Sequence, residues 1–222
     1  STYIWVFGFD PDRRKTARTM HKAPDSLPLS PDTDMPVCVL LAGGLARRMG
    51  GGDKALLTLG GQTILEHMIG RLTDQCRQLV LNVNGDPARF AHRGLPILSD
   101  PVPDHAGPLA GILAALDWVA ENTPDCKHVL SVATDSPFLP LDLVAQLEAA
   151  RIHAGTPLAC AQSGGRLHPP FALWPVSVRF LLREALINES MRRMEDFIRR
   201  QGYATATWDT DPFDPFFNIN TP

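Results

Sequence analysis

The sequence predicts an α/β fold of three layers, in which a mostly parallel central sheet lies between two layers of helices. From Pro36 onward, apolar runs suited to strands alternate with stretches of helical periodicity. One of these runs, residues 36–42, is continuously apolar, as expected for a strand buried on both faces. A glycine-rich loop separates this run from the next helix. Alternation of this kind is typical of a parallel sheet that is covered on both faces.

The loop that follows this first strand, Leu41 to Lys54, reads L-A-G-G-L-A-R-R-M-G-G-G-D-K. Seven of the 17 glycines fall between Gly43 and Gly61, so the backbone there can turn tightly and approach a ligand closely. In a strand, glycine loop and helix, free backbone N–H groups and a helix N-terminus converge on phosphate. Arg48 and Lys54 add positive charge. The loop is therefore predicted to bind a large anionic ligand.

The next elements repeat the alternation. A helix begins after Thr63, which can cap it, and Glu66 can complete a capping box. The helix is followed by a strand over residues 78–84 and by a short strand that begins at Ile97. Pro108 suits the first position of a further helix, whose N-terminus is expected to form a second anion site.

A central strand over residues 128–134 precedes Asp135. In open α/β sheets, ligands bind outside the carboxyl ends of the strands. Leu41, Asn82, Asp100 and Asp135 all lie at or near the carboxyl ends of predicted strands, so we expect them to face one crevice and to form the active site.

The remainder of the chain is less regular. We predict a helix over about 141–150, two antiparallel strands joined by a hairpin at Ser163-G-G-R, helices over 176–187 and 191–201, and a strand over 203–208. We expect a single domain, 36–222, with a nucleotide-binding half (36–140) and an acceptor-binding half (141–222). Residues 1–35 are polar and proline-dotted after Asp10, which predicts an irregular extension.

Composition excludes several classes of function. The net charge is −3, with 21 basic and 24 acidic residues, which gives no sign of a nucleic-acid surface. The four cysteines have no C-x-x-C spacing and are expected to be reduced core thiols. The apolar run at the start has no basic segment ahead of it, and no stretch approaches the ~18 apolar residues of a membrane span, so we expect neither a signal peptide nor a transmembrane helix. We therefore expect a cytoplasmic protein that binds a small anionic ligand, with no nucleic-acid or membrane partner.

The glycine loop is neither a P-loop nor a G-x-G-x-x-G dinucleotide motif. Its order of glycines, arginines, R-M-G and D-K resembles the signature of the MobA-like nucleotidyltransferases, the molybdenum cofactor guanylyltransferases, over about 187 of the 222 residues. The resemblance implies a Rossmann-like fold of the GT-A type. It also implies transfer of GMP from Mg-GTP to the terminal phosphate of molybdenum-molybdopterin, with release of pyrophosphate and formation of the guanine dinucleotide cofactor.

Nucleotidyl transfer needs positioning and charge neutralisation more than a protein nucleophile. Mg²⁺ takes one or two carboxylates together with phosphate oxygens and waters. Asp135 is the best candidate ligand, and the D-x-P-F around it matches the metal aspartate of the family. Asp100 is the second candidate. Lys54 matches the triphosphate lysine of the family, and Arg48 is expected to grip the leaving pyrophosphate.

Guanine offers N–H donors that backbone carbonyls or an asparagine oxygen can accept. We expect the backbone of the L-A-G-G stretch and the amide of Asn82 to lie beside the base. These backbone positions are Leu41, Ala42, Gly43 and Gly44. By resemblance, relatives that use CTP tend to carry alanine in place of Gly43, so this stretch favours GTP.

The acceptor half carries weaker signals. By resemblance, His168, Asn218 and Asn220 correspond to positions near the pterin. A histidine is more often structural than functional, and asparagine commonly serves turns, so a structural role for these side chains stays open.

Three alternative functions remain open. The first is cytidylyl transfer from CTP to the same cofactor, and a less favoured one is nucleotidyl transfer to a sugar phosphate. The third is a non-catalytic adaptor that binds nucleotide and cofactor, which would not need Asp135 or Mg²⁺. The expected small-molecule partners are GTP and molybdopterin, and the product would pass to molybdoenzymes or to their chaperones.

Overall fold

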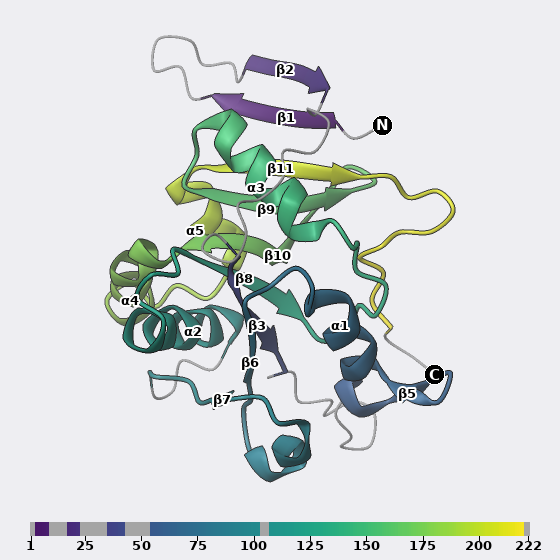
Figure 1. Ribbon diagram of the computed structural model, residues 1–222. Helices are drawn as coiled ribbons and strands as arrows, with labels where there is room; N and C mark the ends of the chain where they lie inside the picture. Colours follow the sequence, from purple (N-terminus) through teal and green to yellow (C-terminus); the bar gives the residue numbers. More distant parts are fainter. Residues whose placement is uncertain (1–2, 9–16, 23–34, 43–53, 103–106, 220–222) are drawn as a thin grey trace.

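The computed structural model describes residues 3–8, 17–22, 35–42, 54–102 and 107–219. Its main feature is a nine-stranded sheet (Figure 1). In spatial order the strands are β2 (Ala17–Lys22), β1 (Tyr3–Gly8), β11 (Tyr203–Trp208), β9 (Leu158–Ser163), β10 (Arg166–Pro175), β8 (His128–Ala133), β3 (Val37–Leu41), β6 (Gln78–Asn82) and β7 (Ile97–Leu98). In the seven strands from β11 to β7, only the two pairings of β10 are antiparallel. The predicted mostly parallel sheet is confirmed.

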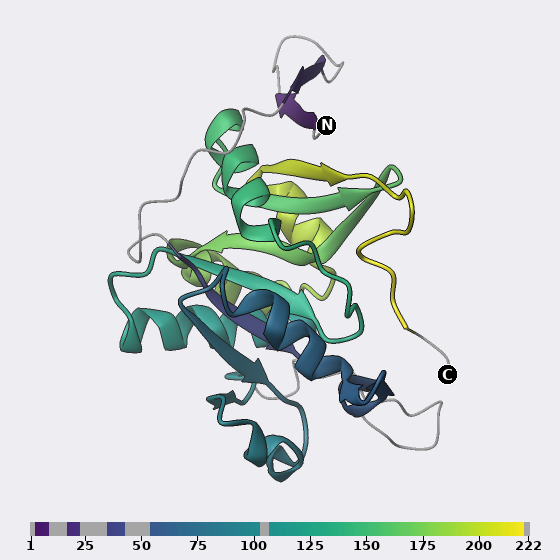
Figure 2. The same cartoon turned by 45° about the vertical axis from the view of Figure 1, so that its right-hand side comes forward.

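Helices cover both faces of this sheet, which gives the predicted three layers (Figures 1 and 2). One face packs against α1 (Ile64–Leu72) and α3 (Leu143–Ala154). The other face packs against α2 (Pro108–Asn122), α4 (Arg179–Ile187) and α5 (Met194–Gln201). Strand β3 shows why its sequence is continuously apolar: Cys38 and Leu40 join the first core, and Val37 and Val39 join the second.

Helix α1 begins as predicted. The Thr63 backbone N–H donates to Glu66 Oε2 at 2.7 Å, and the Glu66 N–H donates to Thr63 Oγ1 at 3.2 Å, which completes the capping box. Glu66 also pairs with Arg93, at the end of the 3₁₀ helix η2 (Pro87–Arg93). The backbone N–H and hydroxyl of Thr63, followed by Arg93, lower the pKa of Glu66 to about 2. Glu66 therefore ties η2 to the start of α1.

The hairpin predicted at Ser163-G-G-R is also confirmed. Strands β9 and β10 pair antiparallel, and Ser163 lies opposite Arg166. Gly164 and Gly165 have φ angles of 52° and 76°, which are left-handed values that favour glycine in a tight turn. The short elements β4 (Thr58–Leu59), β5 (Gln62–Thr63), η1 (Lys54–Leu56) and η3 (Val176–Val178) complete the described structure.

Residues 3–8 and 17–22 differ from the irregular extension that was predicted for residues 1–35. Strands β1 and β2 pair antiparallel, and β1 adds to the edge of the sheet, with Ile4 opposite Ala206 and Trp5 opposite Thr205. The prediction is wrong for these two stretches. The hairpin lies beside β11 at one end of the sheet (Figure 1). Its partner strand is about 200 residues away in the chain, so no local pattern could have indicated the pairing.

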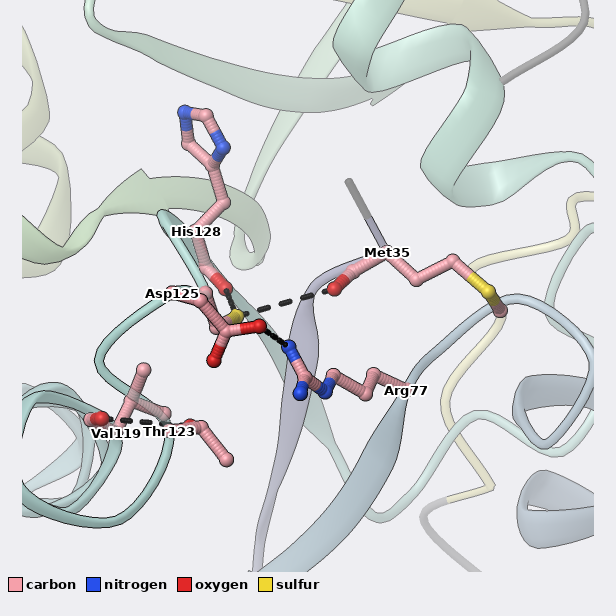
Figure 3. Close-up of polar contacts among 7 residues, drawn as sticks. Met35, Arg77, Val119, Thr123, Asp125 and His128 are labelled. Carbon is pink, nitrogen blue, oxygen red and sulfur yellow. Dashed lines mark hydrogen bonds and ion pairs between the residues drawn. The ribbon is translucent and has the colours of Figure 1, made fainter. Parts of the chain in front are cut away.

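The amino ends of three central strands are fastened together (Figure 3). The Arg77 guanidinium pairs with Asp125, and its backbone N–H donates to the carbonyl of Pro36 at 3.0 Å. The thiol of Cys126 lies near the carbonyls of Met35 and His128, at 3.8 and 3.2 Å. These contacts join the starts of β3, β6 and β8. They fix the register of the sheet at the end opposite to the predicted site.

All four cysteines are buried and free, as predicted from their spacing. Among the helices of the described ranges, none is long and apolar enough to cross a membrane.

Candidate nucleotide site at the carboxyl edge of the sheet

Four neighbouring strands end in one row. The register places Ala133 opposite Leu41, Leu41 opposite Asn82, and Asn82 opposite Leu98. The row continues into the loops, because the Ala42 N–H donates to the Asn82 carbonyl at 2.9 Å. Backbone pairing therefore brings Leu41, Ala42 and Asn82 together at one edge, as the sequence predicted.

The two candidate aspartates flank this row. Asp135 lies two residues beyond the Ala133 position on β8, and Asp100 lies two residues beyond Leu98 on β7. Strands β3 and β6 separate β8 from β7, so three strand spacings of roughly 4.8 Å place them about 14 Å apart. The carboxylate of Asp100 is also turned toward Asn82. This spacing does not favour one ion bound by both aspartates.

The Asp135 carboxylate has an oxygen that could bind a cation. Its Oδ1 is buried and has no hydrogen-bond partner. Burial raises the pKa of Asp135, and the positive charge of Lys54 and a backbone N–H oppose that rise. Burying a carboxylate oxygen without a partner raises the free energy of the folded protein, and a bound metal ion would offset that cost. The residues present therefore fit a divalent ion, although the described residues include no group of three or more His, Cys, Asp or Glu side chains that could enclose one.

Asn82 and Asp100 form a fixed pair. Asn82 is 2% exposed, and its Nδ2 donates to Asp100 Oδ1 at 3.0 Å and to the Leu98 carbonyl at 3.3 Å. Both hydrogen bonds of Asn82 Nδ2 are made to protein oxygens, and one of them orients the Asp100 carboxylate. The partly exposed Asp100 carboxylate is the group that the pair presents to the edge of the sheet.

Leu41 and Ala42, with which the glycine loop begins, lie at this edge. Lys54 begins η1 directly after the loop, and its positive charge counteracts the rise in the pKa of Asp135, which indicates that the two residues lie near each other. The Thr134 hydroxyl donates to the Leu41 carbonyl at 3.2 Å, which ties the start of the loop to the Asp135 segment. The predicted contacts at Gly43, Gly44 and Arg48 lie outside the described residues.

In the acceptor half, His168 is built into a hydrogen-bonded cluster. Its Nε2 lies 2.6 Å from Ser163 Oγ, and the Ser163 hydroxyl donates to Asp214 Oδ1 at 2.8 Å. The hydroxyl has one proton, so His168 must supply its own Nε2 proton to that contact. His168 is 8% exposed, and its ring stacks on Phe216 with centroids 4.9 Å apart. Burial, more than any neighbouring charge, lowers the pKa of His168, which keeps the ring neutral.

Asn218 and the residue after it are hydrogen-bonded to the segment that carries Asp135. Asn218 Oδ1 accepts a hydrogen bond of 2.8 Å from the Ser136 hydroxyl, and the next residue, Ile219, donates its N–H to the Asp135 carbonyl at 2.9 Å. Asn218 is exposed, so its amide also faces solvent. Asn220 lies outside the described residues.

Sequence reasoning missed the residues that hold these groups in place. Ser163, Asp214 and Ser136 join segments up to 82 residues apart, which no local pattern reports. Gly111 in α2 packs against Asn82. The sequence feature that could have indicated this contact is the glycine inside the predicted helix, at the end of G-P-L-A-G.

The chain is similar to known proteins of one family. Residues 38–204 match the family model of the MobA-like NTP transferase domain. A molybdenum cofactor guanylyltransferase of Bradyrhizobium sp. (strain ORS 278) is 57% identical over 183 residues, which cover 82% of this chain and 86% of the relative. One of Rhodopseudomonas palustris (strain HaA2) is 53% identical, over 86% of this chain and 89% of the relative.

A solved structure shares the fold. The molybdopterin-guanine dinucleotide biosynthesis protein A of Archaeoglobus fulgidus superposes with a TM-score of 0.64 at 24% identity, over 85% of this chain and 93% of that protein. Sequence and fold agree: the chain is a nucleotidyltransferase that belongs to the MobA-like NTP transferase family.

Proposed function

We propose that this protein transfers GMP from Mg-GTP to the terminal phosphate of molybdenum-bound molybdopterin, releasing pyrophosphate and forming the molybdopterin guanine dinucleotide cofactor. Family membership and the names of the relatives support the reaction and its substrates. The observation that carries the proposal is the unpartnered, buried Asp135 oxygen close to the charge of Lys54 at the carboxyl edge of the sheet.

The reaction requires no protein nucleophile. An oxygen of the acceptor phosphate attacks the α-phosphorus of GTP, and the bond from that phosphorus to the pyrophosphate oxygen breaks in line. The protein contributes by fixing both substrates and by neutralising charge.

Asp135 would hold Mg²⁺, because its free carboxylate oxygen suits a cation that also binds phosphate oxygens and waters. When bound, Mg²⁺ supplies positive charge against the triphosphate oxygens. Lys54 adds charge from the end of the glycine loop. We assign Arg48 to the leaving pyrophosphate, since a guanidinium can donate two hydrogen bonds to phosphate oxygens.

The base would lie over the row formed by Leu41, Ala42 and Asn82, with Gly43 and Gly44 continuing that backbone. Asp100, oriented by Asn82, offers carboxylate oxygens to the N1–H and exocyclic amine of guanine. Cytosine does not present two adjacent donors of this kind, so the pair supports GTP over CTP.

The acceptor would lie near His168, Asn218 and Asn220. In the neutral ring of His168, Nδ1 is the nitrogen left to accept a hydrogen bond. We propose that the product passes to molybdoenzymes or to their chaperones. Four free, buried thiols suit a reducing compartment, which supports a cytoplasmic location.

Purified protein incubated with molybdenum cofactor, Mg²⁺ and α-labelled GTP tests the function. The expected result is labelled dinucleotide cofactor together with pyrophosphate. Parallel reactions with labelled CTP and with a sugar phosphate as acceptor test the other transferase functions. Turnover with CTP but not GTP would overturn the choice of nucleotide. Binding of GTP and cofactor without release of pyrophosphate would indicate an adaptor.

A further inference from the structure

Gly111 is a buried glycine inside helix α2, next to Asn82 of the candidate nucleotide site. A Cβ at this position would lie 2.2 Å from Asn82 Oδ1, 2.7 Å from Asn82 Cγ and 2.9 Å from Leu41 Cδ2. A Cβ atom essentially never comes this close to a non-bonded heavy atom, so a neighbouring group would have to shift. Glycine is also a poor helix former compared with alanine, so helix stability does not explain its presence. The space that it leaves is filled by the Asn82 carboxamide.

Asn82 has little room to move away from an added methyl group. Its backbone is paired with Leu41 on one side and with Leu98 on the other. Its side chain is buried, and both hydrogen bonds of Nδ2, to Asp100 Oδ1 and to the Leu98 carbonyl, depend on its present rotamer. A methyl group on residue 111 would therefore displace the carboxamide and break its contact with Asp100. The Leu41 methyl is the end of a flexible side chain and can yield.

We propose that Gly111 is a positioning residue for nucleotide binding, which acts through Asn82 to hold the carboxylate of Asp100 at the edge of the sheet. The absence of a side chain on Gly111 lets α2 approach the end of β6 closely enough for the Asn82 amide to lie against the helix. The amide then fixes Asp100. This inference rests on the proposed function, in which Asp100 contacts the base.

Gly70 provides a matched control. It lies inside helix α1, and a Cβ there would meet nothing within 4 Å. Gly70→Ala makes the same chemical change in the same type of element, without a clash. It is expected to raise the melting temperature slightly and to leave GTP affinity unchanged.

The first test is the affinity of Gly111→Ala for Mg-GTP, measured by calorimetry beside wild type and Gly70→Ala. Loss of one hydrogen bond to a charged group predicts affinity about tenfold weaker or more. A Gly111→Ala protein that binds GTP as wild type does would overturn the inference, whatever its melting temperature.

The second test separates positioning from general damage to the fold. Asn82→Ala removes the side chain that the new methyl group would strike. In that background, Gly111→Ala should cause little further loss of affinity or of melting temperature. Additive losses in the double variant would mean that Gly111 does not act through Asn82, and would overturn the inference. If Gly111→Ala alone fails to fold, recovery of folding in the double variant supports the same clash, and failure of both contradicts it.

A third measurement does not depend on nucleotide. The side-chain amide resonance of Asn82, assigned with the help of Asn82→Ala, should move and lose protection from exchange in Gly111→Ala but not in Gly70→Ala. An unmoved resonance would sink the inference even if GTP is the substrate. Conversely, if wild type fails to bind GTP while the resonance moves, the proposed function fails and the steric relation between Gly111 and Asn82 stands.

Discussion

The nucleotide edge and the acceptor region treat their polar side chains differently. At the nucleotide edge, formed by the ends of β8, β3, β6 and β7, Asp135 keeps a buried oxygen with no protein partner. In the acceptor region, formed by β9, β10, β11 and residues 209–219, Ser163, His168 and Asp214 satisfy one another. A buried carboxylate oxygen without a partner is a group that a cation can bind, whereas a satisfied cluster needs no ligand. The acceptor region also holds two buried oxygens without a partner, on Gln162 and Thr207, but both belong to neutral side chains. The two regions should therefore respond differently to substitution.

The largest expected effect is that of Asp135→Asn on turnover. The substitution keeps the shape of the side chain and removes the charge that would hold Mg²⁺, so kcat should fall about 100-fold or more. GTP affinity should fall less, because the loop and base contacts remain. Steady-state kinetics beside a thermal melt test this. Near-native turnover in a folded Asp135→Asn protein would remove Asp135 from the mechanism.

Lys54→Ala should have the next largest effect and a different kinetic signature. Its charge acts on the triphosphate in the ground state and in the transition state, so KM for GTP should rise as kcat/KM falls, by about tenfold or more. Lys54→Arg keeps the charge and should recover part of the loss. Full loss in the arginine variant would show that charge alone does not explain the role of Lys54.

Ser163→Ala tests the acceptor region. It removes the hydroxyl between His168 and Asp214 and leaves two partly or fully buried polar groups without that contact, which should destabilise the fold by about 1–3 kcal/mol. KM for GTP should not change. Thr207→Val is the control, because the buried Thr207 hydroxyl has no partner, so its loss should leave stability equal or higher. Denaturant titrations compare the two, and equal losses would contradict the distinction.

The smallest expected effect concerns pH. Burial raises the pKa of Asp135 in the folded, metal-free protein above its unfolded value. The folded state therefore holds the proton more tightly, and stability falls as pH rises from the unfolded pKa through the folded pKa. Asp135→Asn lacks this penalty. Its melting temperature, measured in chelator, should match that of wild type at low pH and exceed it above the raised pKa. A constant difference across that range would exclude the desolvation effect.

Much of the nucleotide edge could be predicted, because its signals are local. Thr63 and Glu66 lie three residues apart in their capping box, Pro108 stands at the first position of its helix, and Asp135 lies two residues beyond the end of a buried strand. A parallel sheet then brings the strand ends together without further information. The sequence alone therefore located Leu41, Asn82, Asp100 and Asp135 at one edge.

The unpredicted features depend on contacts between distant segments. Ser163 and Asp214 are 51 residues apart, and Gly111 meets Asn82 only after α2 packs on the sheet. The residues that pair between β1 and β11 are still farther apart in the sequence. In each case the energetic reason is a tertiary neighbour, and neither periodicity nor a turn signal records it.

The pairing of β1 with β11 also determines which strand borders the sheet. A strand at the border offers unpaired N–H and C=O groups to other chains, and such edges promote aggregation unless charge or short length prevents it. At one border, β7 has only two residues. At the other border the last strand is β2, with the sequence A-R-T-M-H-K. Without β1 and β2 the last strand would be β11, whose sequence Y-A-T-A-T-W carries no charge. A chain shortened to begin at Pro36 would leave the uncharged strand β11 at the border of the sheet, so we expect that chain to self-associate more readily at high concentration.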